Sequence, residues 1–74
     1  MAWDLEWAAD KAFAAMRYLA DFYPEASEPK ALHRHQDAAH AAAVAGDEAR
    51  YLEALRGYMR AGRDEALRVR KGAA

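Results

Sequence analysis

The scarcity of β-branched side chains is the feature that most limits what this chain can fold into. Its 74 residues include two valines and neither isoleucine nor threonine. β-branched side chains pack well on a pleated sheet, so a sheet in this protein would have almost nothing to hold it together. Alanine, leucine, glutamate and arginine, which are strong helix formers, dominate the sequence. The composition therefore predicts an all-α fold.

Prolines and glycines divide the sequence into predicted helices. Pro24 follows a first helical segment and disfavours helical geometry in the residue before it. Ser27 is a suitable cap for the next helix, and Gly46 is a suitable end to it. The segments AGDEA at 45–49 and AGRDEA at 61–66 resemble each other, and both are typical of a helix that ends and restarts. These signals predict helices over 3–22, 28–45 and 48–61, while 64–70 either forms a short fourth helix or continues the third.

Short links usually make consecutive helices antiparallel neighbours. The segment PEASEP and the glycine at 46 are both short links. The sequence therefore predicts one helical domain over 1–74, a small antiparallel three-helix bundle made of a helical hairpin and an N-terminal helix.

The expected third helix has one clear apolar face. Its large side chains recur at the spacing of an amphipathic helix, with charged residues opposite. We therefore expect this face to lie in the core: Tyr51, Leu52, Leu55, Tyr58 and Met59.

The first helix is unusual because it has two apolar faces. One carries Leu5, Ala9, Ala12, Met16, Leu19 and Tyr23, and we expect it to face the core. A solvent-exposed face seldom carries two tryptophans, so the second face is either sandwiched within the bundle or covered by a partner. The large apolar side chains make a thin core for a chain of this length, which favours association. We predict a homodimer whose interface contains Trp3, Trp7, Lys11, Ala14 and Tyr18.

Three histidines and an aspartate lie close together in the segment LHRHQDAAH. His33, Asp37 and His40 share one side of the second helix and are a ligand set known for zinc or iron. They extend over about 10 Å of helix, at about 1.5 Å per residue, so they do not readily converge on one ion. We favour a surface cluster in which Asp37 pairs with the histidines, and we predict folding without metal.

Charge is unevenly distributed along the chain. The whole protein has a net charge of −1, but most of the basic residues lie in the last third. Arg56, Arg60 and Arg63 form one stripe that could contact phosphates. A solvated face that balances an acidic first helix is the favoured interpretation, and specific nucleic-acid binding at physiological salt is not expected.

Several classes of protein are disfavoured by what the sequence lacks. Without cysteine there is neither a disulfide nor a thiolate zinc site, which is in keeping with a reducing cytoplasm. The chain has no glycine-rich phosphate loop and a single serine, so neither catalysis nor a cofactor is expected. It also has no apolar run long enough to cross a membrane, and its acidic N-terminal residues are unlike a signal peptide.

These observations favour a small cytoplasmic helical module that binds proteins, either by self-association or by docking a partner helix on the exposed aromatic face. The alternative is a nucleic-acid-associated accessory protein that uses the arginine stripe. A metal-binding helical bundle is a weaker alternative.

Overall fold

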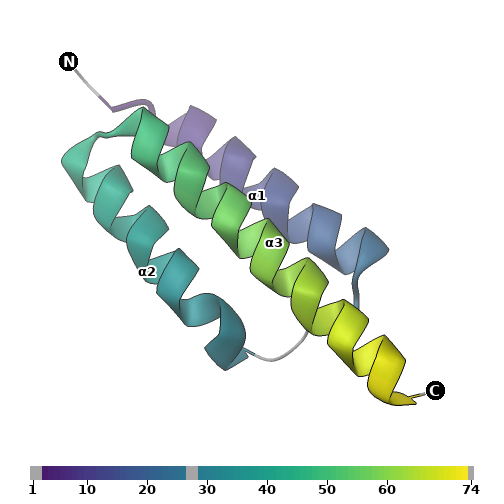
Figure 1. Ribbon diagram of the computed structural model, residues 1–74. Coiled ribbons are helices and arrows are strands. Elements are labelled where there is room, and N and C mark those ends of the chain that lie inside the picture. Colours follow the sequence, from purple (N-terminus) through teal and green to yellow (C-terminus); the bar gives the residue numbers. More distant parts are fainter. Residues whose placement is uncertain (1–2, 27–28, 74) are drawn as a thin grey trace.

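Three helices make up the fold of the computed structural model, which describes residues 3–26 and 29–73. They are α1 (Leu5–Phe22), α2 (Pro29–Ala45) and α3 (Glu48–Ala73), and none of the described residues forms a strand. Figure 1 shows α1 and α3 running in the same direction, with α2 opposed to both. The predicted all-α antiparallel three-helix bundle is confirmed.

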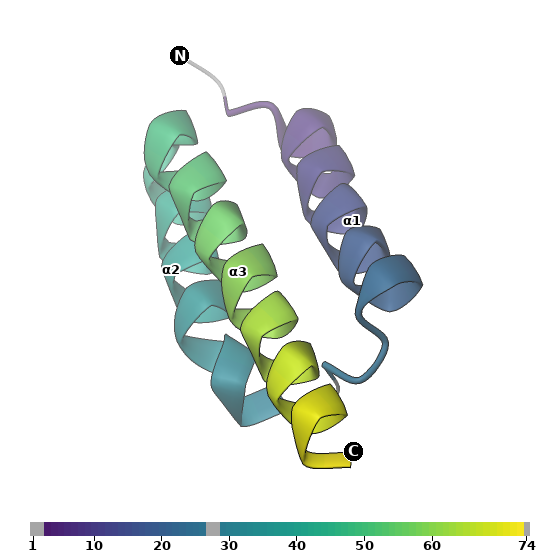
Figure 2. The same ribbon diagram turned by 45° about the vertical axis from the view of Figure 1, so that its right-hand side comes forward.

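Helix α3 is the central element of the bundle. Both α1 and α2 pack on it, whereas α1 and α2 make little contact with each other. In Figure 2 the two outer helices lie on different sides of α3. The bundle is therefore elongated, with principal extents of 50 × 20 × 16 Å. Among the described residues no fourth helix covers the long side between α1 and α2.

Two aspartates define where helices begin. Asp4 caps α1 because its carboxylate accepts a hydrogen bond of 3.0 Å from the Trp7 backbone N–H, so this helix starts at residue 5 and not at residue 3. Asp47 caps α3 in the same way, at 3.1 Å from the Arg50 N–H. The predicted cap Ser27 and the predicted start of the second helix at residue 28 lie outside the described residues.

Gly46 ends α2 as expected, with a left-handed φ of 70°. Its N–H donates to the Ala43 carbonyl at 3.1 Å, and the N–H of Asp47 donates to the Ala42 carbonyl at 3.0 Å. These two bonds are the pair that closes a Schellman motif, in which glycine avoids the strain that a Cβ would suffer.

The predicted break at Gly62 is wrong, because α3 runs without interruption through it to residue 73. One continuous helix therefore replaces both the predicted end at residue 61 and the predicted separate helix over 64–70. Continuation of the third helix through 64–70 was the other interpretation that the sequence allowed. Gly62 is buried, and a Cβ built there would lie 2.6 Å from Cδ1 of Leu19 in α1. The glycine allows two helices to approach closely and does not end either of them.

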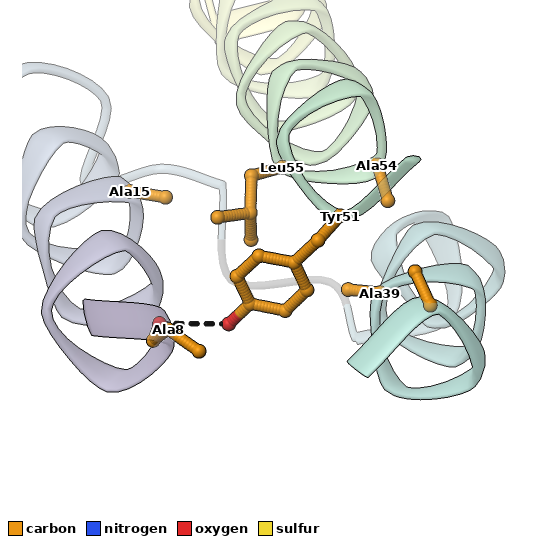
Figure 3. Close-up of a cluster of buried hydrophobic side chains, with 7 residues drawn as sticks. Ala8, Ala15, Ala39, Tyr51, Ala54 and Leu55 are labelled. Carbon is orange, nitrogen blue, oxygen red and sulfur yellow. Dashed lines mark hydrogen bonds between the residues drawn. The ribbon is translucent and has the colours of Figure 1, made fainter. Parts of the chain in front are cut away.

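The core is built mostly from alanine. Tyr51 and Leu55 are the large side chains of the central buried cluster, and Tyr58 and Met59 pack against it, which confirms the predicted inward face of the third helix for these four residues. The fifth predicted residue, Leu52, is only partly buried and lines a hollow instead. The Tyr51 hydroxyl donates a 2.8 Å hydrogen bond to the Ala8 carbonyl and so links α3 to α1 (Figure 3). The buried alanines around it are Ala8, Ala15, Ala39, Ala42 and Ala54.

The predicted orientation of α1 is wrong in its main features. Leu5 and Met16 are exposed, although Leu19 is buried as expected. The ring centroids of Trp3 and Trp7 lie 5.5 and 6.2 Å from that of Tyr51 in the same chain. Small residues let α1 approach α3, and Tyr51 provides an aromatic surface for both tryptophans, so this face turns inward.

A salt bridge ties the C-terminal end of α3 to the segment that follows α1. The guanidinium of Arg70 donates to both carboxylate oxygens of Glu25, at 2.7 and 2.9 Å. It also donates to the Phe22 carbonyl at 2.7 Å and lies over the ring of Tyr23. One side chain therefore satisfies a carbonyl at the end of α1 and holds the following segment against α3.

Candidate functional site

A groove runs between α1 and α2 on the uncovered side of the bundle. We call it the α1–α2 groove; its volume is about 270 Å³. The floor is formed by α3, and the walls are alanines with a methionine on α1 and polar side chains along the rim of α2. The lining residues are Ala12 and Met16 from α1, His35, Gln36, Ala39, His40 and Ala43 from α2, and Tyr51, Leu55 and Tyr58 from α3.

One wall of this groove continues into a row of exposed apolar side chains. At 100° per residue, these side chains fall within one quarter of the helix surface. Leu5 is 72% exposed, Phe13 63% and Met16 57%. We call this row the α1 stripe; its members are Leu5, Ala9, Phe13, Met16 and Ala20.

The α1 stripe and the α1–α2 groove form one continuous apolar surface, because Met16 belongs to both. A soluble protein rarely exposes several large apolar side chains side by side, and such patches usually mark an interaction site. The shape is a trough beside a ridge of large side chains. Such a surface can accept an amphipathic helix.

Charged side chains border the α1 stripe on the edge away from the groove. Glu6 and Asp10 lie in the first half of α1, whereas Arg17 lies in the second half and pairs with Asp21 at 3.5 Å. Asp10 and Arg17 are equally far from the midpoint of α1, which extends from Leu5 to Phe22. The border is therefore acidic at one end and carries its one base at the other.

The opposite side of α3 carries a second, basic surface. The predicted stripe of Arg56, Arg60 and Arg63 is exposed there, and we call it the arginine ridge. A hollow of about 340 Å³ beside the ridge is lined by these three residues with Tyr18 and Met59. The Nε of Arg63 lies 3.6 Å from Oδ1 of Asp64. Arg56 and Arg60 form no ion pair within the described part of the chain.

The predicted interface residues are divided between two environments. Trp3 and Trp7 pack within the chain on Tyr51, so the idea that the tryptophans are left outside the core is wrong. The Nε1 of Trp3 is buried there without a hydrogen-bond partner. Lys11 lies over the ring of Trp7, at 5.8 Å from its centroid. Lys11, Ala14 and Tyr18 line a shallow hollow that also reaches Arg56, so part of the predicted interface adjoins the arginine ridge.

Hydrogen bonding and burial raise the pKa values of two tyrosines near these surfaces. The pKa of Tyr18 is raised above its ordinary value, chiefly by its hydrogen bond with Tyr23. The pKa of Tyr51 is raised by burial. Both hydroxyls therefore remain protonated at neutral pH, and that of Tyr51 stays available to donate to Ala8.

The histidine cluster does not form a metal centre in this structure. His33, Asp37 and His40 are all exposed on α2. Nowhere in the described ranges do three or more histidine, cysteine, aspartate or glutamate side chains come together so that they could hold a metal ion. Folding without added metal stays a prediction.

Sequence reasoning missed the α1 stripe, since it assigned Leu5 and Met16 to the core. Phe13 was the available signal, because it is a large apolar side chain that fits neither of the two faces described from the sequence.

Comparison of the chain with protein families, with curated proteins and with solved structures found no match. Among the described residues, no helix is both long enough and apolar enough to cross a membrane.

Proposed function

We propose that this protein is a helical interaction module that self-associates through the α1 stripe and the α1–α2 groove. The single observation that carries the proposal is the continuity of the two: a ridge of exposed large side chains borders an apolar trough. In a two-fold dimer, the α1 stripes of the two copies pack against each other in opposite directions, and each stripe also covers the adjoining edge of the other copy's groove. One self-complementary contact then covers both ridges and the edges of both troughs.

The amount of exposed apolar surface supports a second copy as the occupant. Full burial of a leucine, phenylalanine or methionine side chain contributes about 1.5–3 kcal/mol. Leu5, Phe13 and Met16 are each roughly two-thirds exposed, so the six side chains of two copies would contribute about 6–12 kcal/mol. Association itself costs about 4–15 kcal/mol. A stable dimer therefore needs the stripe and the groove to be covered together, as the two-fold arrangement does.

The charges along α1 support an antiparallel arrangement of the two copies. When two α1 helices cross at their midpoints in opposite directions, Asp10 of one copy lies beside Arg17 of the other, and this pairing occurs twice. Glu6 then lies beside Asp21, whose charge is already offset by Arg17 in its own helix. Charge complementarity of this kind sets the register of a pair more than its affinity.

Substitution of Phe13 tests the surface. We expect light scattering to find the wild type as a dimer at high micromolar concentration and Phe13→Glu as a monomer with unchanged helicity. Leu67→Glu is the matched control, because Leu67 is an exposed apolar residue on α3 that does not line the groove. A monomeric wild type would refute the proposal, and so would equal dissociation of both variants.

A charge exchange tests the register. Asp10→Arg and Arg17→Asp should each weaken the dimer, because each places like charges side by side at both symmetry-related contacts. The double variant should recover part of the lost affinity, because both pairs are re-formed with opposite polarity while Asp21 loses Arg17 as its partner. If the double variant is as weak as the sum of the single ones, the antiparallel register is wrong. If all variants are monomeric like the wild type, a helix of another protein is the alternative occupant.

A further inference from the structure

Four cationic side chains from two helices surround one half-buried tyrosine on the side of the bundle away from the groove. Tyr18 of α1 lines a hollow with the arginine ridge of α3. Lys11 joins the same surface, since it lines an adjacent hollow with Tyr18 and Arg56. The surface exists because α1 packs closely on α3 through Gly62, a contact that the sequence pattern alone does not show.

The cations on this surface are only partly neutralised. Arg63 has a neighbouring carboxylate, Asp64, at 3.6 Å, and this pair is exposed. In the described ranges Arg56 and Arg60 have no ion-pair partner. Exposed arginines without carboxylate partners are well suited to bind phosphate oxygens, because the guanidinium offers two parallel donors.

The arrangement of these cations selects among anionic ligands. Arg56, Arg60 and Arg63 follow the axis of α3 and extend over about 10 Å, at about 1.5 Å per residue. Consecutive phosphates of a strand match a row of that length better than a single phosphate group does. Tyr18 adds an aromatic ring beside the row, and unpaired bases stack on such rings.

We propose that the arginine ridge, with Lys11 and Tyr18, binds single-stranded nucleic acid through its phosphate backbone and one stacked base. The binding is independent of sequence, because no element of the surface reads a base edge. It is also strongly salt-dependent, because the affinity comes mainly from the release of counterions. This surface lies on a different side of the bundle from the α1–α2 groove, so the inference does not depend on self-association.

Fluorescence anisotropy with a labelled oligothymidylate of about 16 nucleotides tests the proposal. At about 50 mM salt the wild type should bind, and affinity should fall steeply towards about 200 mM. Arg60→Ala should weaken binding several-fold and make the slope of log affinity against log salt shallower by about 0.7. Arg34→Ala, which removes the same charge from the exposed side of α2, should change affinity less than twofold, about the scatter expected for a distant contact.

Tyr18→Leu separates stacking from charge. This variant should lose at least about fivefold in affinity for the single strand, with an unchanged salt slope, because stacking does not release counterions. A duplex of the same length should bind more weakly than the single strand. Three results would overturn the proposal. The first is no binding by the wild type at low salt, and the second is an equal effect of Arg34→Ala and Arg60→Ala on affinity. The third is that the duplex binds as tightly as the single strand and Tyr18→Leu has no effect on affinity.

Discussion

At the scale of single residues, the same amino acid serves different purposes at different places in this protein. Gly46 adopts a left-handed conformation that ends a helix, and a Cβ there would meet nothing within 4 Å. Gly62 is an ordinary helical residue whose missing side chain makes room for Leu19, and Gly57 makes room for His35 in a similar way. Local sequence does not distinguish these roles, since a glycine shortly before the residues Asp-Glu-Ala occurs in both AGDEA and AGRDEA.

Gly62→Ala is predicted to destabilise the protein although alanine is the better helix former. The substitution gains about 1 kcal/mol in helix propensity. Its Cβ would lie 2.6 Å from Cδ1 and 2.7 Å from Cδ2 of Leu19, which is buried. Overpacking of this kind costs about 1–3 kcal/mol. Denaturant unfolding at one fixed protein concentration should therefore show a net loss of stability.

Gly72→Ala is the matched control for this prediction. It lies in the same helix, and an added Cβ would meet no atom within 4 Å. We expect its stability to be unchanged or slightly higher. If both variants are equally stable, the close approach of α1 and α3 at Gly62 does not constrain the fold.

At the scale of elements, residues close in sequence determine where each helix begins and ends. The neighbouring helices determine how each helix is rotated about its own axis. Asp4 and Asp47 supply hydrogen bonds to the first turns of α1 and α3, and both contacts are local in sequence. The rotation of α1 about its own axis depends on Tyr51, which lies in another helix and bonds to the Ala8 carbonyl. That is why the starts of α1 and α3 and the ends of α1 and α2 were predictable to within a few residues, whereas the end of α3 and the inward face of α1 were not.

Gly46→Ala tests the helix end. The new Cβ would have free space around it, so any effect comes from the left-handed φ of 70°. An L-residue in that conformation costs about 1–2 kcal/mol. We expect a loss of about this size in the free energy of unfolding, and a smaller loss for Gly46→Asn because asparagine tolerates the conformation better. Equal stability of wild type and Gly46→Ala would mean that the connection adopts another geometry.

At the scale of the whole molecule, the fold is a central helix with two others that scarcely touch each other. This arrangement creates the α1–α2 groove on one side and the arginine ridge with Tyr18 on another. The contact between Arg70 and Glu25 fastens the far end of the assembly by joining α3 to the segment after α1. Helicity alone does not produce either surface.

The Glu25–Arg70 contact predicts a specific dependence of stability on pH. The hydrogen bond from Arg70 is the largest cause of a lowered pKa of Glu25 in the folded protein. A lowered folded pKa means that the contact stabilises the fold above the unfolded pKa and that this contribution is lost as pH falls through the folded pKa. The melting temperature of the wild type should exceed that of Glu25→Gln near neutral pH, and the difference should vanish well below the ordinary glutamate pKa of about 4.3.

Glu53→Gln is the control for this measurement, because Glu53 is an exposed carboxylate on α3 that forms no ion pair within the described part of the chain. Its melting temperature should follow that of the wild type across the same pH range. A Glu25→Gln difference that persists in acid would show that the contact does not depend on the charge of Glu25.

The sequence by itself determined what depends on local chemistry. With only two β-branched residues the chain favours helices, and proline, glycine and aspartate place most of their ends. The exposed positions of the three ridge arginines also follow from their spacing opposite the apolar face of α3. These features are set by interactions between residues no more than a few positions apart.

The tertiary structure alone decided which face of α1 lies inside and whether Gly62 ends a helix. Both outcomes depend on contacts between helices that are distant in sequence: Tyr51 with Trp3 and Trp7, and Leu19 with Gly62. A helix with two apolar faces has two ways to bury one of them, and its own periodicity does not choose between them. Packing against α3 made the choice, and it thereby left Leu5, Phe13 and Met16 as the exposed surface.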